Sequence, residues 1–178
     1  MLTKNDIEKY FIAEKQESIL FFSIGIIAII SAIFFIFYFK NNFFRGIAIP
    51  LIVIGILQCI VGFTVYLKSD SDRVKMVYAY DMNPSEFKKS ELPRMETVNK
   101  NFVIYRWSEI FLLLIGIIIY LKLRNNNTIE SSWSGNGFIL GIGIALAIQA
   151  ALMLSADYFA EKRANIYINK IIEFINKN

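Results

Sequence analysis

The stretch NFVIYRWSEIFLLLIGIIIYL, residues 101–121, decides the fold. It carries Arg106 and Glu109 near its start and then runs without a charge from Ile110 to Leu121. Because a helix needs about 20 mostly apolar residues to cross the hydrocarbon core of a bilayer, this stretch is long enough only if the two charges lie at the membrane boundary. It is therefore predicted to be a transmembrane helix that brings a charged pair to the edge of the membrane.

Four apolar runs can be drawn along the chain, at residues 19–39, 47–67, 104–121 and 138–156. A hydrophobic fraction of 56% over 178 residues is too high for an ordinary soluble domain. In lipid the backbone must satisfy its own hydrogen bonds, so these runs are expected to be helices. The sequence thus predicts an all-α membrane protein with four transmembrane helices in one domain.

The charged segments at residues 68–103 and 157–178 are expected to extend these helices out of the membrane. Asn83-Pro84 predicts a helix break followed by a helix start, and Leu92-Pro93 predicts a second start. Lys and Arg number three before the first run, seven in residues 68–103 and four after residue 156, against two in residues 40–46 and two in residues 122–137. This asymmetry places both termini and the middle segment in the cytoplasm. Richness in Ile, Asn, Lys and Phe favours a bacterial source, and hence the inner membrane.

The two halves of the chain share a pattern that indicates two tandem helical hairpins. Gly46 precedes Gln58 by twelve residues, and Gly137 precedes Gln149 by the same interval. A duplicated hairpin related by an axis along the membrane normal is one explanation. Chance similarity between apolar sequences is the other.

Folding the polar faces of the four helices inward predicts one polar cluster near the cytoplasmic boundary. Its members are Glu17, Arg106, Glu109, Asp157, Glu161 and Arg163. They either hold the helices together at the interface, where a charge costs far less than at the bilayer centre, or line a cavity that binds a cation or proton. Gln58 and Gln149 are expected near mid-membrane, where an interhelical hydrogen bond is favoured over an ion ligand.

Composition removes most catalytic chemistry. The chain has no His and one Cys, Cys59, inside an apolar run, which disfavours zinc sites, disulfides and Cys/His nucleophiles. We therefore expect no enzyme activity, no metal site and no cofactor. The net charge of +4 lies at helix ends, so a nucleic-acid partner is not expected.

In size, topology and general character the whole chain resembles the small four-span bacterial inner-membrane proteins of the toxin-immunity type. This resemblance implies a non-enzymatic protein that binds a protein partner and neutralises a cognate toxin. The alternative is a small oligomeric transporter or channel subunit for a cation or small metabolite, supported by the carboxylate-rich cluster. An enzyme acting on lipid is the least supported possibility. The expected partners are the lipid bilayer, another protein and, in the alternative, further copies of this chain.

Overall fold

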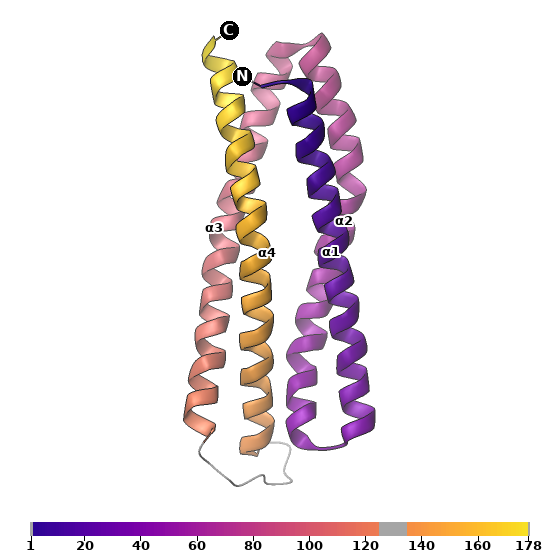
Figure 1. The fold of residues 1–178 in the computed structure, drawn as a ribbon, viewed down its shortest axis with the longest axis vertical. Coiled ribbons are helices and arrows are strands. Elements are labelled where there is room, and N and C mark those ends of the chain that lie inside the picture. The colour runs from indigo at the N-terminus through magenta and orange to yellow at the C-terminus, as the bar shows by residue number, and fades with distance from the viewer. Residues whose placement is uncertain (1, 125–134, 178) are drawn as a thin grey trace. The chain divides into compact units, whose positions relative to one another are not determined.

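The computed structural model describes residues 2–124 and 135–177, and nearly all of them are helical. The helices are α1 (Lys4–Phe34), which continues as a short π-helix, η1 (Phe35–Phe39), then α2 (Asn42–Met82), α3 (Pro84–Leu123) and α4 (Asn136–Lys177), as Figure 1 shows. The described ranges contain no β-strand. The predicted all-α fold is confirmed, and all four helices are long and apolar enough to cross a membrane.

Two short connections follow from local sequence. Lys40, between η1 and α2, has a left-handed backbone with φ of 49°. Asn83 separates α2 from α3 and caps α3, because its Oδ1 accepts a hydrogen bond from the Glu86 backbone N–H at 3.3 Å. The predicted break at Asn83-Pro84 is therefore confirmed.

The second helix start, predicted at Pro93, is wrong. α3 runs through Pro93 without interruption. Residues on both sides of this proline are anchored in the structure, since Glu91 and Met95 are buried. Their burial holds the helix together although proline lacks the backbone N–H that would donate to the carbonyl four residues earlier.

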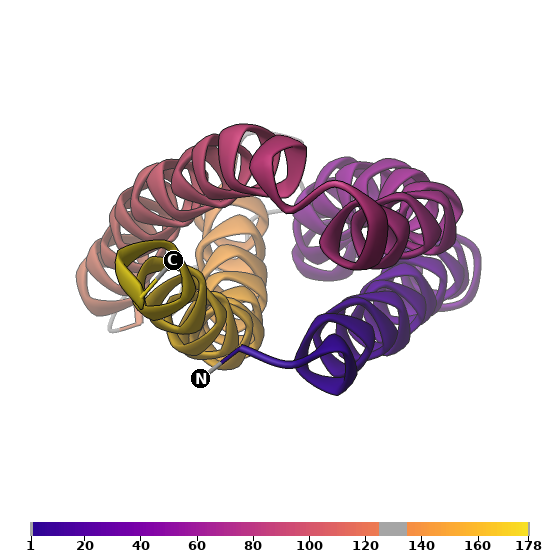
Figure 2. The same ribbon diagram turned by 90° about the horizontal axis from the view of Figure 1, so that it is seen from above.

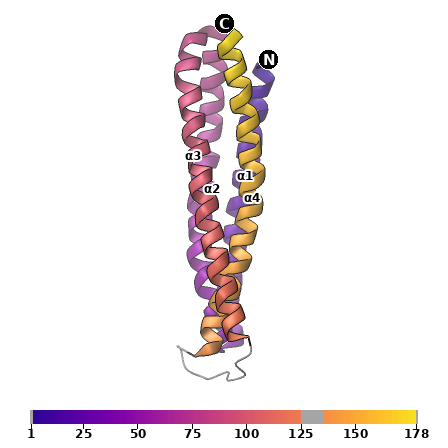
Figure 3. The same cartoon turned by 90° about the vertical axis from the view of Figure 1, so that its left-hand side faces the viewer.

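The chain divides into two compact units, and each helix contributes a segment to both. The first, called the charged unit here, comprises Met1–Leu20, Gly62–Tyr105 and Ala156–Asn178. The second, called the apolar unit, comprises Phe21–Val61 and Arg106–Ser155. Both described ends of the chain and the α2–α3 connection therefore belong to the charged unit (Figure 3).

The charged unit has an apolar core like that of a water-soluble helical bundle. Figure 2 looks onto its helix segments from the end that carries both termini. Aromatic contacts join the helices, including the Tyr10–Tyr167 stack at 4.4 Å and the Phe87–Phe174 edge contact at 6.1 Å between ring centroids. The buried core residues are Leu2, Ile7, Tyr10, Phe11, Met76, Ala79, Phe87, Met95, Ala164, Tyr167, Ile168, Ile171 and Phe174.

The apolar unit has the opposite arrangement, with small and polar residues inside and large apolar ones outside. Its buried residues include five alanines, Ala28, Ala32, Ala48, Ala145 and Ala150, together with Gln58, Glu109 and Gln149. Its exposed residues include many large apolar side chains, such as Ile27, Ile30, Phe37, Phe111 and Ile118. A water-soluble unit would not expose so continuous an apolar surface, whereas lipid chains cover it without cost. This arrangement supports the assignment of a membrane protein.

Glycines set the close helix contacts of the apolar unit. A Cβ atom built on Gly46 of α2 would lie 2.0 Å from the Phe138 carbonyl oxygen of α4, and one on Gly141 of α4 would lie 2.2 Å from the Phe43 carbonyl oxygen of α2. Only glycine lets the two backbones approach so closely. The contact is reciprocal between the second helices of the two hairpins, and duplication of the hairpin stays a prediction.

Candidate functional site

The predicted polar cluster is divided between the two units. Glu17 of α1 and Arg163 of α4 form an ion pair in the charged unit. Asp157 and Glu161 also lie in the charged unit and are partly buried on α4.

The other two members lie on α3 in the apolar unit. Arg106 is partly buried there, and Glu109 is buried. The description of six charges as one site stays a prediction.

Gln58 and Gln149 are both buried in the apolar unit. The amide oxygen of each has no hydrogen-bond partner among the described residues. Burial of an amide oxygen without a hydrogen bond costs about 1–3 kcal/mol. These two oxygens therefore lack the stabilisation that an interhelical hydrogen bond would give.

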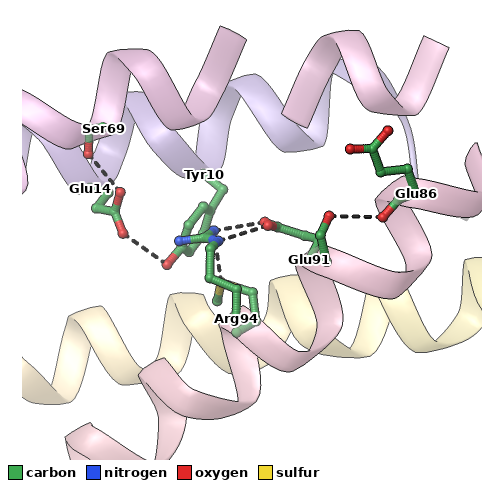
Figure 4. Close-up of polar contacts among 8 residues, drawn as sticks. Tyr10, Glu14, Ser69, Glu86, Glu91 and Arg94 are labelled. Carbon is green, nitrogen blue, oxygen red and sulfur yellow. Dashed lines mark hydrogen bonds and ion pairs between the residues drawn. The ribbon is translucent and has the colours of Figure 1, made fainter. Parts of the chain in front are cut away.

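A polar layer that the sequence did not predict crosses the charged unit (Figure 4). In it, Glu14 of α1 accepts hydrogen bonds from the Ser69 hydroxyl of α2 at 2.7 Å and from the Tyr10 hydroxyl at 3.2 Å. On α3, Arg94 donates two hydrogen bonds of 2.8 Å to the two carboxylate oxygens of Glu91. The side chain of Glu91 is 0% exposed, so this pair is a buried ion pair with fork-like geometry.

Aromatic rings connect the two parts of the polar layer. The Arg94 guanidinium lies over the Phe11 ring, 4.9 Å from its centroid, and the Arg163 guanidinium lies 5.6 Å from the centroid of Tyr10. Burial raises the pKa of Tyr10, and the nearby Glu14 carboxylate raises it further. Burial and the charge of Glu91 raise the pKa of Tyr167 in the same way. Both hydroxyls therefore stay protonated at neutral pH.

In the charged unit, an apolar face of α2 is left uncovered. On α2, Val74, Tyr78 and Met82 follow one another at spacing four and are 62%, 65% and 70% exposed. They lie on the side of α2 opposite to Met76, which is buried in the core. Leu67 and Ser71 are exposed on the same side. We call these five residues the outer face of α2.

Two aspartates border one edge of the outer face and are held by lysines of α1. Asp81 accepts a hydrogen bond from Lys4 at 2.9 Å, and Asp70 forms an ion pair with Lys15. Two lysines, Lys68 and Lys75, border the other edge by helical spacing. The sequence could have indicated this face, because its members recur at the helical period within the charged segment.

The described part of the chain was compared with the side-chain groupings that bind metal ions. Residues 2–124 and 135–177 contain no group of three or more Cys, Asp or Glu side chains placed to hold a metal ion.

Comparison of the chain with models of known protein families, with curated proteins and with solved structures found no match.

Proposed function

We propose that this chain is a non-enzymatic membrane protein that binds a protein partner through its charged unit. The observation that carries the proposal is the outer face of α2. The charged unit already has a packed apolar core, so the exposure of Val74, Tyr78 and Met82 at helical spacing is not needed for folding. A contiguous apolar patch on a surface that faces water is typical of a protein-interaction site.

The apolar unit would serve as the membrane anchor. Its exposed large side chains suit lipid, and its helices are long enough to span a bilayer. The lysines and arginines of the charged unit favour a cytoplasmic position by the positive-inside rule, with both termini on that side of a bacterial inner membrane. A reporter enzyme that is active only in the cytoplasm, fused to the C-terminus, tests this orientation.

Protection against a cognate toxin is the specific role that the resemblance in size and topology suggests. In such a role, the outer face would bind the toxin or the toxin's target at the membrane. Expression of the chain in a strain that is sensitive to membrane-acting toxins, followed by challenge with those toxins, tests this role. Survival that depends on an intact outer face supports it, and equal killing with and without the chain contradicts it.

Partner binding itself is tested by purification of the full chain from native membranes in mild detergent. The double variant Val74→Ser with Tyr78→Ser removes the centre of the outer face, and Ile166→Ser, an exposed position on α4 in the same unit, is the matched control. We expect a stoichiometric partner protein with the unmodified chain and with the control, and its loss from the double variant. Absence of any partner, or equal retention by all three proteins, would contradict the proposal.

The second candidate is a subunit of an oligomeric transporter or channel. Burial of Glu109, Gln58 and Gln149 in the apolar unit favours it, because polar residues inside membrane bundles often mark substrate or ion pathways. Flux of cations into proteoliposomes containing the purified chain tests this function. Flux that Glu109→Gln abolishes would favour the transporter over the binding protein.

A further inference from the structure

We infer that the outer face of α2 receives an acidic amphipathic helix of the partner protein. This inference rests on the proposed protein-binding function and adds the chemistry of the partner. The two edges of the outer face differ in charge balance, and that difference selects the partner.

The acidic edge of the outer face is already neutralised within the charged unit. Asp70 lies between Lys15 and Arg73, and Asp81 is bonded to Lys4. The bond to Lys15 lowers the pKa of Asp70, so its carboxylate stays ionised and paired at neutral pH. This edge therefore offers little charge to a partner.

The basic edge is not neutralised by ion pairs in this way, although Asp72 lies four residues after Lys68 and three before Lys75 on the same helix. Lys68 and Lys75 are exposed, and neither has an ion-pair partner among the described residues. They lie seven residues apart, so both project from the same edge, two turns apart. A partner that covers the outer face would bring its own flanking side chains close to these lysines, and carboxylates there complete the charge balance.

The shape of the outer face favours a helix as the occupant. Val74, Tyr78 and Met82 form one ridge at spacing four, which packs into the groove between the corresponding rows of another helix. Tyr78 supplies a large apolar area with a polar tip, and Met82 adapts to irregular apolar surfaces. The partner helix should therefore carry apolar residues at spacings of three and four with Asp or Glu beside them.

A second copy of this chain is a poorer match. Two α2 helices from copies in the same membrane run parallel, and a two-fold axis between them places the basic edge of each copy beside the acidic edge of the other. The aspartates of that acidic edge are already bonded to Lys4 and Lys15, so they offer Lys68 and Lys75 of a second copy no unpaired carboxylate. The charges on this face thus favour a different, acidic chain.

The test uses the full chain in its native membranes with a photo-crosslinking amino acid, p-benzoylphenylalanine, at Ser71. Ser71 is exposed on the outer face, so the apolar ridge stays intact. The same amino acid at Asn169, exposed on α4 in the charged unit, is the control for chance collisions. Crosslinked peptides are identified by mass spectrometry, which gives the sequence of the segment that lies on the outer face.

Charge reversal then tests the basic edge. Lys68→Glu together with Lys75→Glu should lower the crosslinking yield at Ser71 by about tenfold, because two attractive contacts become repulsive. Lys162→Glu, an exposed position on α4, is the matched control and should leave the yield unchanged. Replacement of the partner's flanking carboxylates by lysine should restore crosslinking to the doubly reversed chain.

The crosslinking results test separately whether a protein partner binds and whether that partner is an acidic amphipathic helix. A crosslink to an acidic amphipathic segment that charge reversal weakens supports the inference. A crosslink to a protein segment without flanking carboxylates, or one that charge reversal does not affect, overturns the inference and leaves the protein-binding function standing. Crosslinks only to lipid, only to a second copy, or to nothing overturn both.

Discussion

Removal of Arg94 tests the energetic role of the polar layer in the charged unit. Arg94→Met keeps the length and much of the volume of the side chain but leaves the Glu91 carboxylate, which is 0% exposed, without its two hydrogen bonds of 2.8 Å. Breaking a buried ion pair by removing one partner costs about 3–5 kcal/mol, because a charge stays in the interior uncompensated. The lost contact of the guanidinium with the Phe11 ring adds about 0.5–1 kcal/mol. We expect the charged unit to lose stability of this order.

The assay is native-state hydrogen exchange of the full chain in lipid nanodiscs, read at backbone amides of the charged unit. Hydrogen exchange reports the opening free energy of one region, so the apolar unit serves as an internal reference. Lys177→Met is the matched control, because its ion pair with Glu173 is exposed on both sides and should contribute little. The double variant Glu91→Leu with Arg94→Met should recover most of the loss, since no charge remains buried.

Two results would refute this reasoning. If Arg94→Met destabilises the charged unit no more than Lys177→Met, then Glu91 reaches water or another partner. Removal of Arg94 would in that case not leave a buried charge unpaired. If the double variant is as unstable as Arg94→Met alone, then the loss comes from packing around the side chain and not from the isolated carboxylate.

Three further predictions concern single contacts. The hydrogen bond from Lys170 lowers the pKa of Asp6 from 3.8 to about 2, so the contribution of Asp6 to stability is present above pH 4 and is lost as the pH falls toward 2. The midpoint temperature of thermal unfolding should therefore fall less between pH 5 and pH 2 for Asp6→Asn than for the unmodified chain. Gly46→Ala places a Cβ atom against the Phe138 carbonyl oxygen, so α2 and α4 must separate there. The free energy of unfolding in detergent should then fall by about 1–3 kcal/mol. An unchanged free energy of unfolding would mean that the two backbones do not approach so closely. Gln149→Leu removes a buried amide whose oxygen has no partner among the described residues, so the same assay should show equal or greater stability; a loss above about 1 kcal/mol would show that the amide completes a hydrogen bond.

The helices and their apolar runs were predictable because the signal is local. A run of about 20 apolar residues specifies a membrane helix without knowledge of its neighbours. The extension of α2 as far as Met82 was predictable for the same reason, since Asn83-Pro84 ends it. The error at Pro93 came from reading proline alone, whereas burial of Glu91 and Met95 on either side keeps α3 continuous.

The polar layer was not predictable. Its members meet only because each packed helix has a particular rotational orientation about its own axis. Glu14 and Ser69 are 55 residues apart in the chain and bond at 2.7 Å. Tyr10 and Tyr167 stack across an even longer separation. Glu17 and Arg163 were both placed in the predicted polar cluster, but their pairing with each other was not predicted. Which charges become fully buried depends on packing that the helical period alone does not specify.

The inverted packing of the apolar unit has a consequence for how its sequence can change over generations. At inward positions such as Ala32, Ala48 and Gly141, size is the constraint, so almost every mutation there is expected to be removed by selection. At outward positions such as Ile27 and Phe37, exchange among Ile, Leu, Val and Phe should be nearly neutral, and only a charge should be eliminated. Related chains should therefore keep their smallest residues and vary their largest, which is the reverse of the pattern in a water-soluble bundle.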